Sequence, residues 1–233
     1  MITAALLVTA SVVGYKKLPK ATGCPSLQFI IADRSERLYV TESELLQLLE
    51  TEHLNPIGKP ANSIALHRIE QTVENHPMVR TAECYLTPRA EVRVRLTQRV
   101  PLLHVQSPTG VFFIDTDRRV MQARAVVRDS VPVATGAISA QMASTRLADF
   151  VIWMNGDRYW WERIRRIHVS SSDKIYIILR GEHQPRVLLG DIKDYERKLR
   201  KLRTFLEDGV DATKDKHYSE LDLRFKGQVI GRY

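Results

Sequence analysis

Residues 75–101 read NHPMVRTAECYLTPRAEVRVRLTQRVP and contain the signals that decide the fold of the first half of the chain. The stretch opens on an Asn-His-Pro step, which predicts the end of a helix because the residue before a proline disfavours the helical conformation. Further on, Val92, Val94 and Leu96 alternate with polar residues, as on a strand with one buried face. Since the Thr-Pro-Arg-Ala step at residues 87–90 is typical of a turn, the stretch predicts a helix end followed by a β-hairpin.

The residues before this stretch predict one strand and two helices. Residues 26–33, SLQFIIAD, form a short apolar run typical of a strand. Thr41 and Glu44 have the spacing of a capping box at a helix start, and a second pattern near helical spacing covers residues 64–73. The resulting order of strand, helix, helix, strand and strand predicts a compact α+β module whose sheet is covered on one side.

The chain after Pro101 predicts a second α+β domain. Short apolar runs separated by turn signals indicate an extended, mostly antiparallel sheet, and a helix is expected over residues 144–154. The clearest helix covers residues 191–208, with apolar residues on one face and basic residues on the other. The last run, LDLRFKGQVIGRY at residues 221–233, is predicted to form one terminal strand with alternating faces.

The N-terminus is apolar and predicts a membrane segment. Residues 1–15 carry no charge, and Lys16, Lys17 and Lys20 follow at once. As a helix this stretch reaches roughly 22 Å, short of the roughly 30 Å hydrocarbon core of a bilayer. We therefore expect residues 1–25 to hold part of a single-pass anchor and a linker, with a cleaved signal peptide and a buried core helix as alternatives. By the positive-inside rule, these three lysines taken alone would place the chain that directly follows the apolar segment in the cytoplasm.

Composition and motifs give no support for an enzyme site. Lys and Arg outnumber Asp and Glu by 35 to 27, and the net charge of +8 favours acidic surroundings without identifying them. The seven histidines lack a His-x-x-x-His pair, and the sequence has no nucleophile-elbow, phosphate-loop or dinucleotide-binding motif. Asp115 and Asp117 are interpreted as turn residues. We therefore expect no catalytic, cofactor-binding or metal-ligating residues.

Two further features have a structural interpretation. The basic helix face at residues 197–203 has no aromatic residues interleaved with it for base stacking, so a nucleic-acid partner is not expected. Cys24 and Cys84 lack the short spacing of a zinc or redox motif and are interpreted as packing thiols. A bridge between the two cysteines remains open at this point.

Landmarks spread along the chain resemble one protein family. In the first half they are Gly-Lys-Pro at 58–60, the helix stop at 75–79, and Gln-Arg-Val-Pro at 98–101, which look like a POTRA domain. In the second half they are Phe-Ile-Asp at 113–115, Leu-Gly-Asp at 189–191 and Leu-Asp-Leu-Arg-Phe at 221–225. Together they resemble the FtsQ (DivIB) family of bacterial division proteins. The chain departs from the family at its end, where Phe225 replaces a frequent Tyr and Tyr233 stands near the place of a Trp.

The resemblance implies a domain organisation and a function. It implies a POTRA domain at residues 26–105 and an FtsQ-type β domain at 106–233, after the anchor at 1–25. It also implies a non-enzymatic scaffold of the division machinery, the divisome, that recruits and links membrane and periplasmic partners during septum formation. The protein would cross the cell inner membrane once, with its body in the periplasm at the division septum. The alternatives are a POTRA-bearing translocation or assembly subunit of the outer envelope and a periplasmic accessory of a cell-wall enzyme.

The resemblance further implies partners of the FtsB and FtsL type at the C-terminal strand, and other division proteins at the POTRA domain. A strand at a chain end leaves one row of backbone groups unpaired, so it can accept a partner strand. Basic residues on the preceding helix are expected to meet acidic groups of the partner. The expected partner-binding residues are Arg224, Phe225, Lys226, Gly227, Gln228, Val229, Gly231 and Tyr233 on the strand, and Arg197 and Arg200 on the helix. The alternative is that this strand only completes the sheet and that Phe225 belongs to the core.

Overall fold

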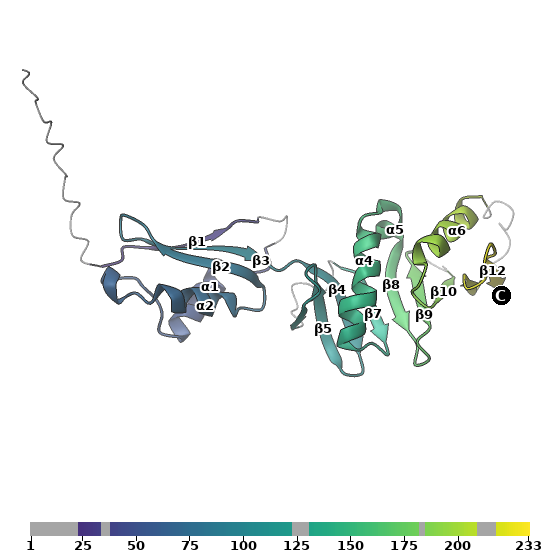
Figure 1. The fold of residues 1–233 in the computed structure, drawn as a ribbon, viewed down its shortest axis with the longest axis horizontal. Coiled ribbons are helices and arrows are strands. Elements are labelled where there is room, and N and C mark those ends of the chain that lie inside the picture. The colour runs from purple at the N-terminus through teal and green to yellow at the C-terminus, as the bar shows by residue number, and fades with distance from the viewer. Residues whose placement is uncertain (1–22, 34–37, 123–130, 182–184, 209–217) are drawn as a thin grey trace, which may run out of the picture.

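The computed structural model describes residues 23–33, 38–122, 131–181, 185–208 and 218–233, which form two lobes joined end to end (Figure 1). The predicted membrane segment at residues 1–15 lies outside the described residues. Among the residues that are described, none of the helices combines the length and the apolar character needed to cross a membrane.

The N-terminal lobe has the predicted order of strand, helix, helix, strand and strand. Its sheet has the order β1-β3-β2, with β1 parallel and β2 antiparallel to the central strand. The elements are β1 (Leu27–Ile31), α1 (Glu42–Thr51), a 3-10 turn (Ala61–Ser63), α2 (Leu66–Glu74), β2 (Val79–Leu86) and β3 (Val92–Gln98). Thr41 and Glu44 form both hydrogen bonds of the predicted capping box at the start of α1. Leu45 and Leu49 of α1 and Ile69 and Val73 of α2 fill the core beneath the sheet.

Helix α2 closes the outer edge of β2. The carboxylate of Glu74 accepts a hydrogen bond from the backbone N–H of Ala82 at 3.1 Å, and that of Glu70 accepts one from Cys84 N–H at 2.9 Å. These two donors would otherwise be available to an incoming strand. Burial, and secondarily the nearby Glu70 charge, raises the pKa of the Cys84 thiol to about 12. Cys84 and the buried Cys24 are both free thiols, as packing cysteines would be.

The C-terminal lobe is a nine-stranded sheet with the order β12-β11-β10-β9-β8-β7-β4-β5-β6. Its strands are β4 (Pro101–Ser107), β5 (Gly110–Asp115), β6 (Val120–Gln122), β7 (Val133–Gly136), β8 (Ile164–Val169), β9 (Ile175–Leu179), β10 (Arg186–Gly190), β11 (Glu220–Asp222) and β12 (Ile230–Arg232). The sheet is mixed, and five of its eight strand pairs are antiparallel, in agreement with the predicted mostly antiparallel sheet. Three pairs, β4–β7, β7–β8 and β10–β11, are parallel. Helical segments carry the chain across between β7 and β8 and between β10 and β11, and strands β5 and β6 lie in the sequence between β4 and β7.

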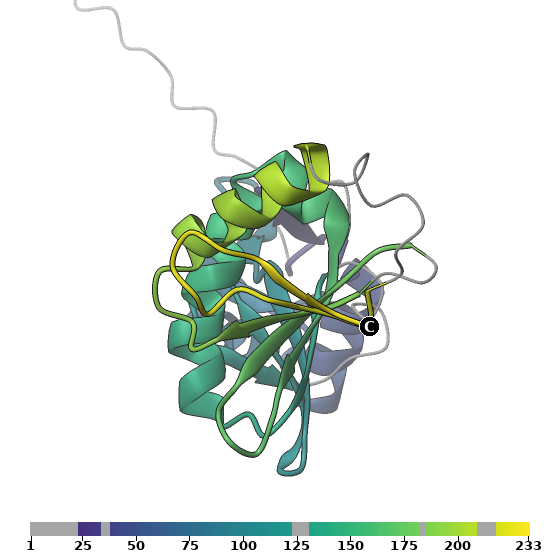
Figure 2. The same ribbon diagram turned by 90° about the vertical axis from the view of Figure 1, so that its right-hand side faces the viewer.

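Helices cover one face of this sheet. They are α3 (Ala140–Met142), a π-helical turn (Ala143–Leu147), α4 (Ala148–Asn155), α5 (Arg158–Arg163) and α6 (Tyr195–Asp208). Figure 2 views this lobe end-on and shows α4 and α6 on the same side of the strands, with the yellow terminal hairpin toward the viewer. Phe150 and Trp160 are buried between these helices and the sheet. The sheet and its helices therefore hold the terminal hairpin against a packed core.

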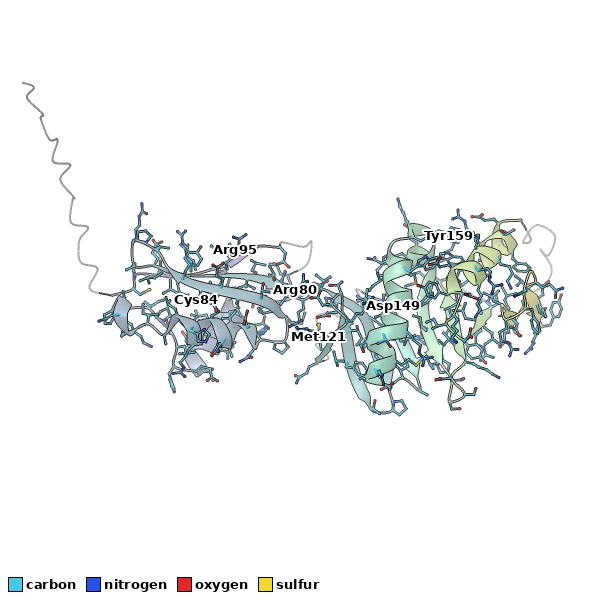
Figure 3. All side chains as sticks on the ribbon, in the orientation of Figure 1. Arg80, Cys84, Arg95, Met121, Asp149 and Tyr159 are labelled. Atoms are coloured by element: carbon cyan, nitrogen blue, oxygen red, sulfur yellow. The ribbon has the colours of Figure 1, made fainter. Side chains whose placement is uncertain are left out.

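The change from one sheet to the other lies between β3 and β4. The expected boundary at residues 105/106 falls inside β4, which already pairs with β5 and β7 of the large sheet. Phe113 of β5 and Met121 of β6 pack into the core of the N-terminal lobe, and Figure 3 labels Met121 at the junction. The sequence did not reveal this position because only two residues, Arg99 and Val100, separate β3 from β4, with no turn or linker signal between the strands.

Ion pairs also join the lobes at this junction. Asp115, at the end of β5, accepts a hydrogen bond from Arg99 at 2.9 Å, and Asp117 pairs with Arg80 of β2 at 2.7 Å. The backbone N–H of Thr116 donates to the carbonyl of Val100. The turn predicted at residues 115–117 is thus present, and it also links the two lobes.

Candidate partner-binding edge

The C-terminal run forms a hairpin and not the single strand that was predicted. Residues 220–222 and 230–232 form β11 and β12, which pair antiparallel, and residues 223–229 form the loop between them. Gly227 has a φ of +69°, a conformation that favours glycine, within this loop. The alternation predicted for one long strand is therefore wrong: Leu221, Asp222 and Leu223 are all buried, while Phe225 is 47% exposed.

Strand β12 lies at one end of the nine-stranded order, next to β11. Within the described part of the chain, no strand pairs with its outer side. The strand is short, which limits the number of backbone hydrogen bonds it can offer. Among the described residues, this edge is nevertheless a candidate site for strand addition.

Ion pairs fix the hairpin to the sheet. Glu220 of β11 lies between Arg186 of β10, at 2.9 Å, and Arg232 of β12, at 3.1 Å. The fully buried carboxylate of Asp222 accepts hydrogen bonds from the side chain of Arg224, the closest at 2.7 Å, and from its backbone N–H. Carboxylates of β11 thus bind arginines on both neighbouring segments, which holds the edge strand in register.

The stability of the hairpin is expected to depend on pH through Asp222. Hydrogen bonds from Arg224 lower the pKa of Asp222, so its stabilising effect is present above its unfolded-state pKa, near 4, and is lost as pH falls through the lower folded-state value. Replacing Asp222 by Asn should lower the free energy of unfolding by roughly 2 kcal/mol at pH 7. In urea unfolding, the difference between the two proteins should shrink as the pH is lowered from 7 toward 3. A difference that does not change with pH would show that the charge of Asp222 is not what stabilises the hairpin.

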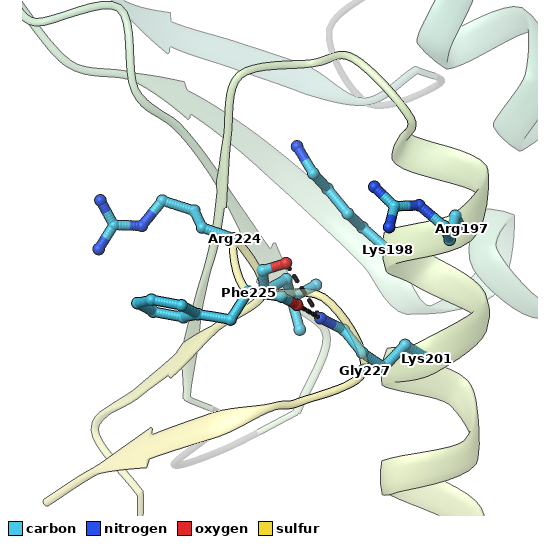
Figure 4. Close-up of a pocket in the computed structure, with 7 residues that line it drawn as sticks. Arg197, Lys198, Lys201, Arg224, Phe225 and Gly227 are labelled. Atoms are coloured by element: carbon cyan, nitrogen blue, oxygen red, sulfur yellow. Dashed lines mark hydrogen bonds between the residues drawn. The ribbon is translucent and has the colours of Figure 1, made fainter.

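A pocket of about 260 Å³ lies between α6 and the hairpin loop (Figure 4). Its lining combines cationic side chains with apolar surface: Arg197, Lys198, Lys201, Leu223, Arg224, Phe225 and Gly227. The ammonium of Lys201 donates to the backbone carbonyls of Leu223 and Phe225. Burial, and then the charge of Arg197, lowers the pKa of Lys201. The pocket could accept an apolar side chain flanked by an acidic one.

Aromatic residues lie beside the free edge. The rings of Tyr218 and Tyr233 stack with their centroids 5.0 Å apart, and Phe205 of α6 lies 6.1 Å from Tyr218. Gly231 leaves room for this arrangement, since a Cβ there would lie 2.2 Å from the Tyr218 ring. Tyr233 is 72% exposed. Exposed aromatic groups held by their neighbours are common in protein interfaces.

The structure brings four of the ten expected partner-binding residues together at the pocket. Arg197, Arg224, Phe225 and Gly227 line the pocket. The other expected hairpin residues are the exposed Lys226, Gln228 and Tyr233 and the half-buried Val229 and Gly231. Arg200 does not line this pocket. It lines two other hollows, one with Tyr195 and Glu196 and one with Trp153 and Glu196.

The sequence-based expectation missed several residues of this edge. They are Lys198, Lys201, Asp222, Tyr218 and Arg232. The spacing of residues 197 and 201, one helical turn apart, is the one signal that could have placed Lys201 beside Arg197. Across the described ranges, no group of three or more His, Cys, Asp or Glu side chains could hold a metal ion.

Comparisons with known proteins match both lobes. A family model described as FtsQ/DivIB, C-terminal related, matches residues 100–232, and a model for a POTRA-like domain matches residues 22–97. No curated protein matches the chain. The two matched ranges meet where the structure passes from β3 to β4.

Proposed function

Because the chain belongs to the FtsQ/DivIB C-terminal related family, we propose that it is a scaffold that recruits and links proteins of the bacterial division machinery during septum formation. The POTRA-like domain that precedes the matched region supports this, since the two occur here in the order typical of that family. Its role is binding, and we expect no catalytic activity.

The observation that carries the proposal is the position of β12 at the end of the nine-stranded sheet. Addition of a partner strand there would supply backbone hydrogen bonds, and the neighbouring side chains would select the partner. The pocket beside the loop is lined by Arg197, Lys198, Lys201 and Arg224, so the partner should carry acidic residues next to an apolar one. Membrane proteins of the FtsB and FtsL type are the proposed partners at this edge.

The proposal extends to the rest of the chain. The POTRA-like domain would bind other division proteins, and residues 1–25 would contain part of a single-pass anchor in the cell inner membrane. The two lobes would then lie in the periplasm at the septum. A reporter enzyme that is active only in the periplasm, fused after Tyr233 in a chain with an intact anchor, should be active; activity of a cytoplasm-only reporter would refute this orientation.

Binding at the edge is tested by titrating the full-length protein with a peptide from the periplasmic region of an FtsB-type partner. Tyr233→Ala removes the exposed aromatic ring, and Lys226→Glu reverses a charge on the hairpin loop. We expect each to weaken binding about thirtyfold or more, because hot-spot residues at the centre of an interface contribute roughly 2 kcal/mol or more.

The matched control is Lys174→Glu, which makes the same change of charge in the turn between β8 and β9. It should leave the affinity within about twofold, and circular dichroism should show that all three variants fold. Equal affinities for the wild type and both hairpin variants would refute the proposed site.

A further inference from the structure

The loop between β11 and β12 is exposed yet well anchored. Residues 224–228 are all exposed to solvent, which is typical of a mobile loop. The backbone N–H of Leu223 donates to the carbonyl of Leu188 at 2.9 Å, and Arg224 is bound to Asp222. These contacts fix only the start of the loop, so the residues beyond Arg224 need another anchor.

Lys201 supplies that anchor from α6. Its ammonium donates to the carbonyl of Leu223 at 3.1 Å and to the carbonyl of Phe225 at 2.5 Å, as the dashed lines in Figure 4 show. One positive group therefore binds the backbone at two points, on either side of Arg224. Phe225 is held at the wall of the pocket with its ring half exposed.

The neighbouring Lys198 has a different role. It lines the same pocket, but its ammonium binds the carbonyl and the carboxylate of Asp191, at 2.8 and 2.6 Å, just before α6. Of the two lysines, then, Lys201 contacts the loop and Lys198 contacts the start of its own helix.

We propose that Lys201 is a positioning residue for partner recognition: it holds the β11–β12 loop in the binding-competent conformation and so presents Phe225 and the edge of β12. The inference rests on the proposed function, because it concerns the same edge. Lys201 acts through the loop backbone. When only a fraction of the free protein has the competent conformation, the apparent affinity falls by that fraction.

The test replaces Lys201 by Met, which keeps the length of the side chain and removes its donors. Amide hydrogen exchange in the free protein should speed up in residues 224–229. The association rate of the FtsB-type peptide should fall about tenfold, while its dissociation rate should change less than twofold, because the hydrogen bonds of the Lys201 ammonium go to the carbonyls of Leu223 and Phe225 in the loop. Lys201→Arg retains a positive group with several N–H donors, and it should restore most of the association rate.

Lys198→Met is the matched control, since it removes the same charge from the same pocket. Any fall in the association rate of this variant measures the electrostatic effect of removing one positive charge. Amide hydrogen exchange in the loop should be unchanged in it. Unchanged loop exchange in Lys201→Met, an unchanged association rate, or a loss of affinity that resides in dissociation would each overturn the positioning role. Failure of the wild-type protein to bind the peptide would instead overturn the proposed function.

Discussion

Replacing Gly136 by Ala should lower the free energy of unfolding by more than about 3 kcal/mol. Gly136 ends β7 with a φ of +106°, which side chains other than glycine rarely adopt, and an added Cβ would lie 2.0 Å from the carbonyl oxygen of Val169. That carbonyl belongs to the neighbouring strand β8 and already accepts a hydrogen bond from Ala137. The strands must separate to admit the methyl group, and urea unfolding measures the loss.

Gly110→Ala separates the two causes of this loss. Gly110 also has a positive φ, of +136°, but an added Cβ there would meet no atom within 4 Å. This variant should lose about 1 to 2 kcal/mol from backbone strain alone. Equal losses at the two positions would show that contact with Val169 contributes nothing.

Replacing Asp115 by Ala should lower the free energy of unfolding by about 3 kcal/mol, because it leaves a partner charge without compensation near the junction of the lobes. Asp115 is 1% exposed and Arg99 only 13%. The same carboxylate also accepts the backbone N–H of Arg119 at 2.7 Å, which stabilises the turn. Urea unfolding at pH 7 gives the measurement.

Asp117→Ala is the control in the same turn. The pair of Asp117 with Arg80 is far more exposed, so its loss should reduce the free energy of unfolding by less than about 1 kcal/mol. A loss at Asp117 as large as that at Asp115 would contradict the assignment of Asp115 as the buried link between the lobes.

The sequence predicted the N-terminal lobe well because its signals are local. The capping box, the helix stop at residues 75–77 and the alternation in β3 each depend on residues a few positions apart. The link made by Asp115 could not be predicted in this way, since it depends on Arg99 lying opposite the turn. The local pattern Asp-Thr-Asp at residues 115–117 would be the same in a turn that makes no contact with another lobe.

The candidate edge was located from the sequence, but its form was not. Alternation in residues 221–225 fits a strand of any length, and Gly227 alone did not show where the chain reverses. The buried position of Asp222 follows from Arg224 and Arg232, which reach it from the loop and from the next strand. The sequence placed Lys201 only on the basic face of its helix, because the two carbonyls that its ammonium binds come together in the folded hairpin alone.

Amide hydrogen exchange with and without saturating FtsB-type peptide tests the central claim most directly, namely that a partner adds to the edge of β12. We predict slower exchange in β12 and in the adjacent loop, at residues 225–232, and unchanged exchange in β6 at the opposite end of the same sheet. Identical exchange of residues 225–232 in the two states, or protection confined to β6 or to the N-terminal lobe, would contradict the account.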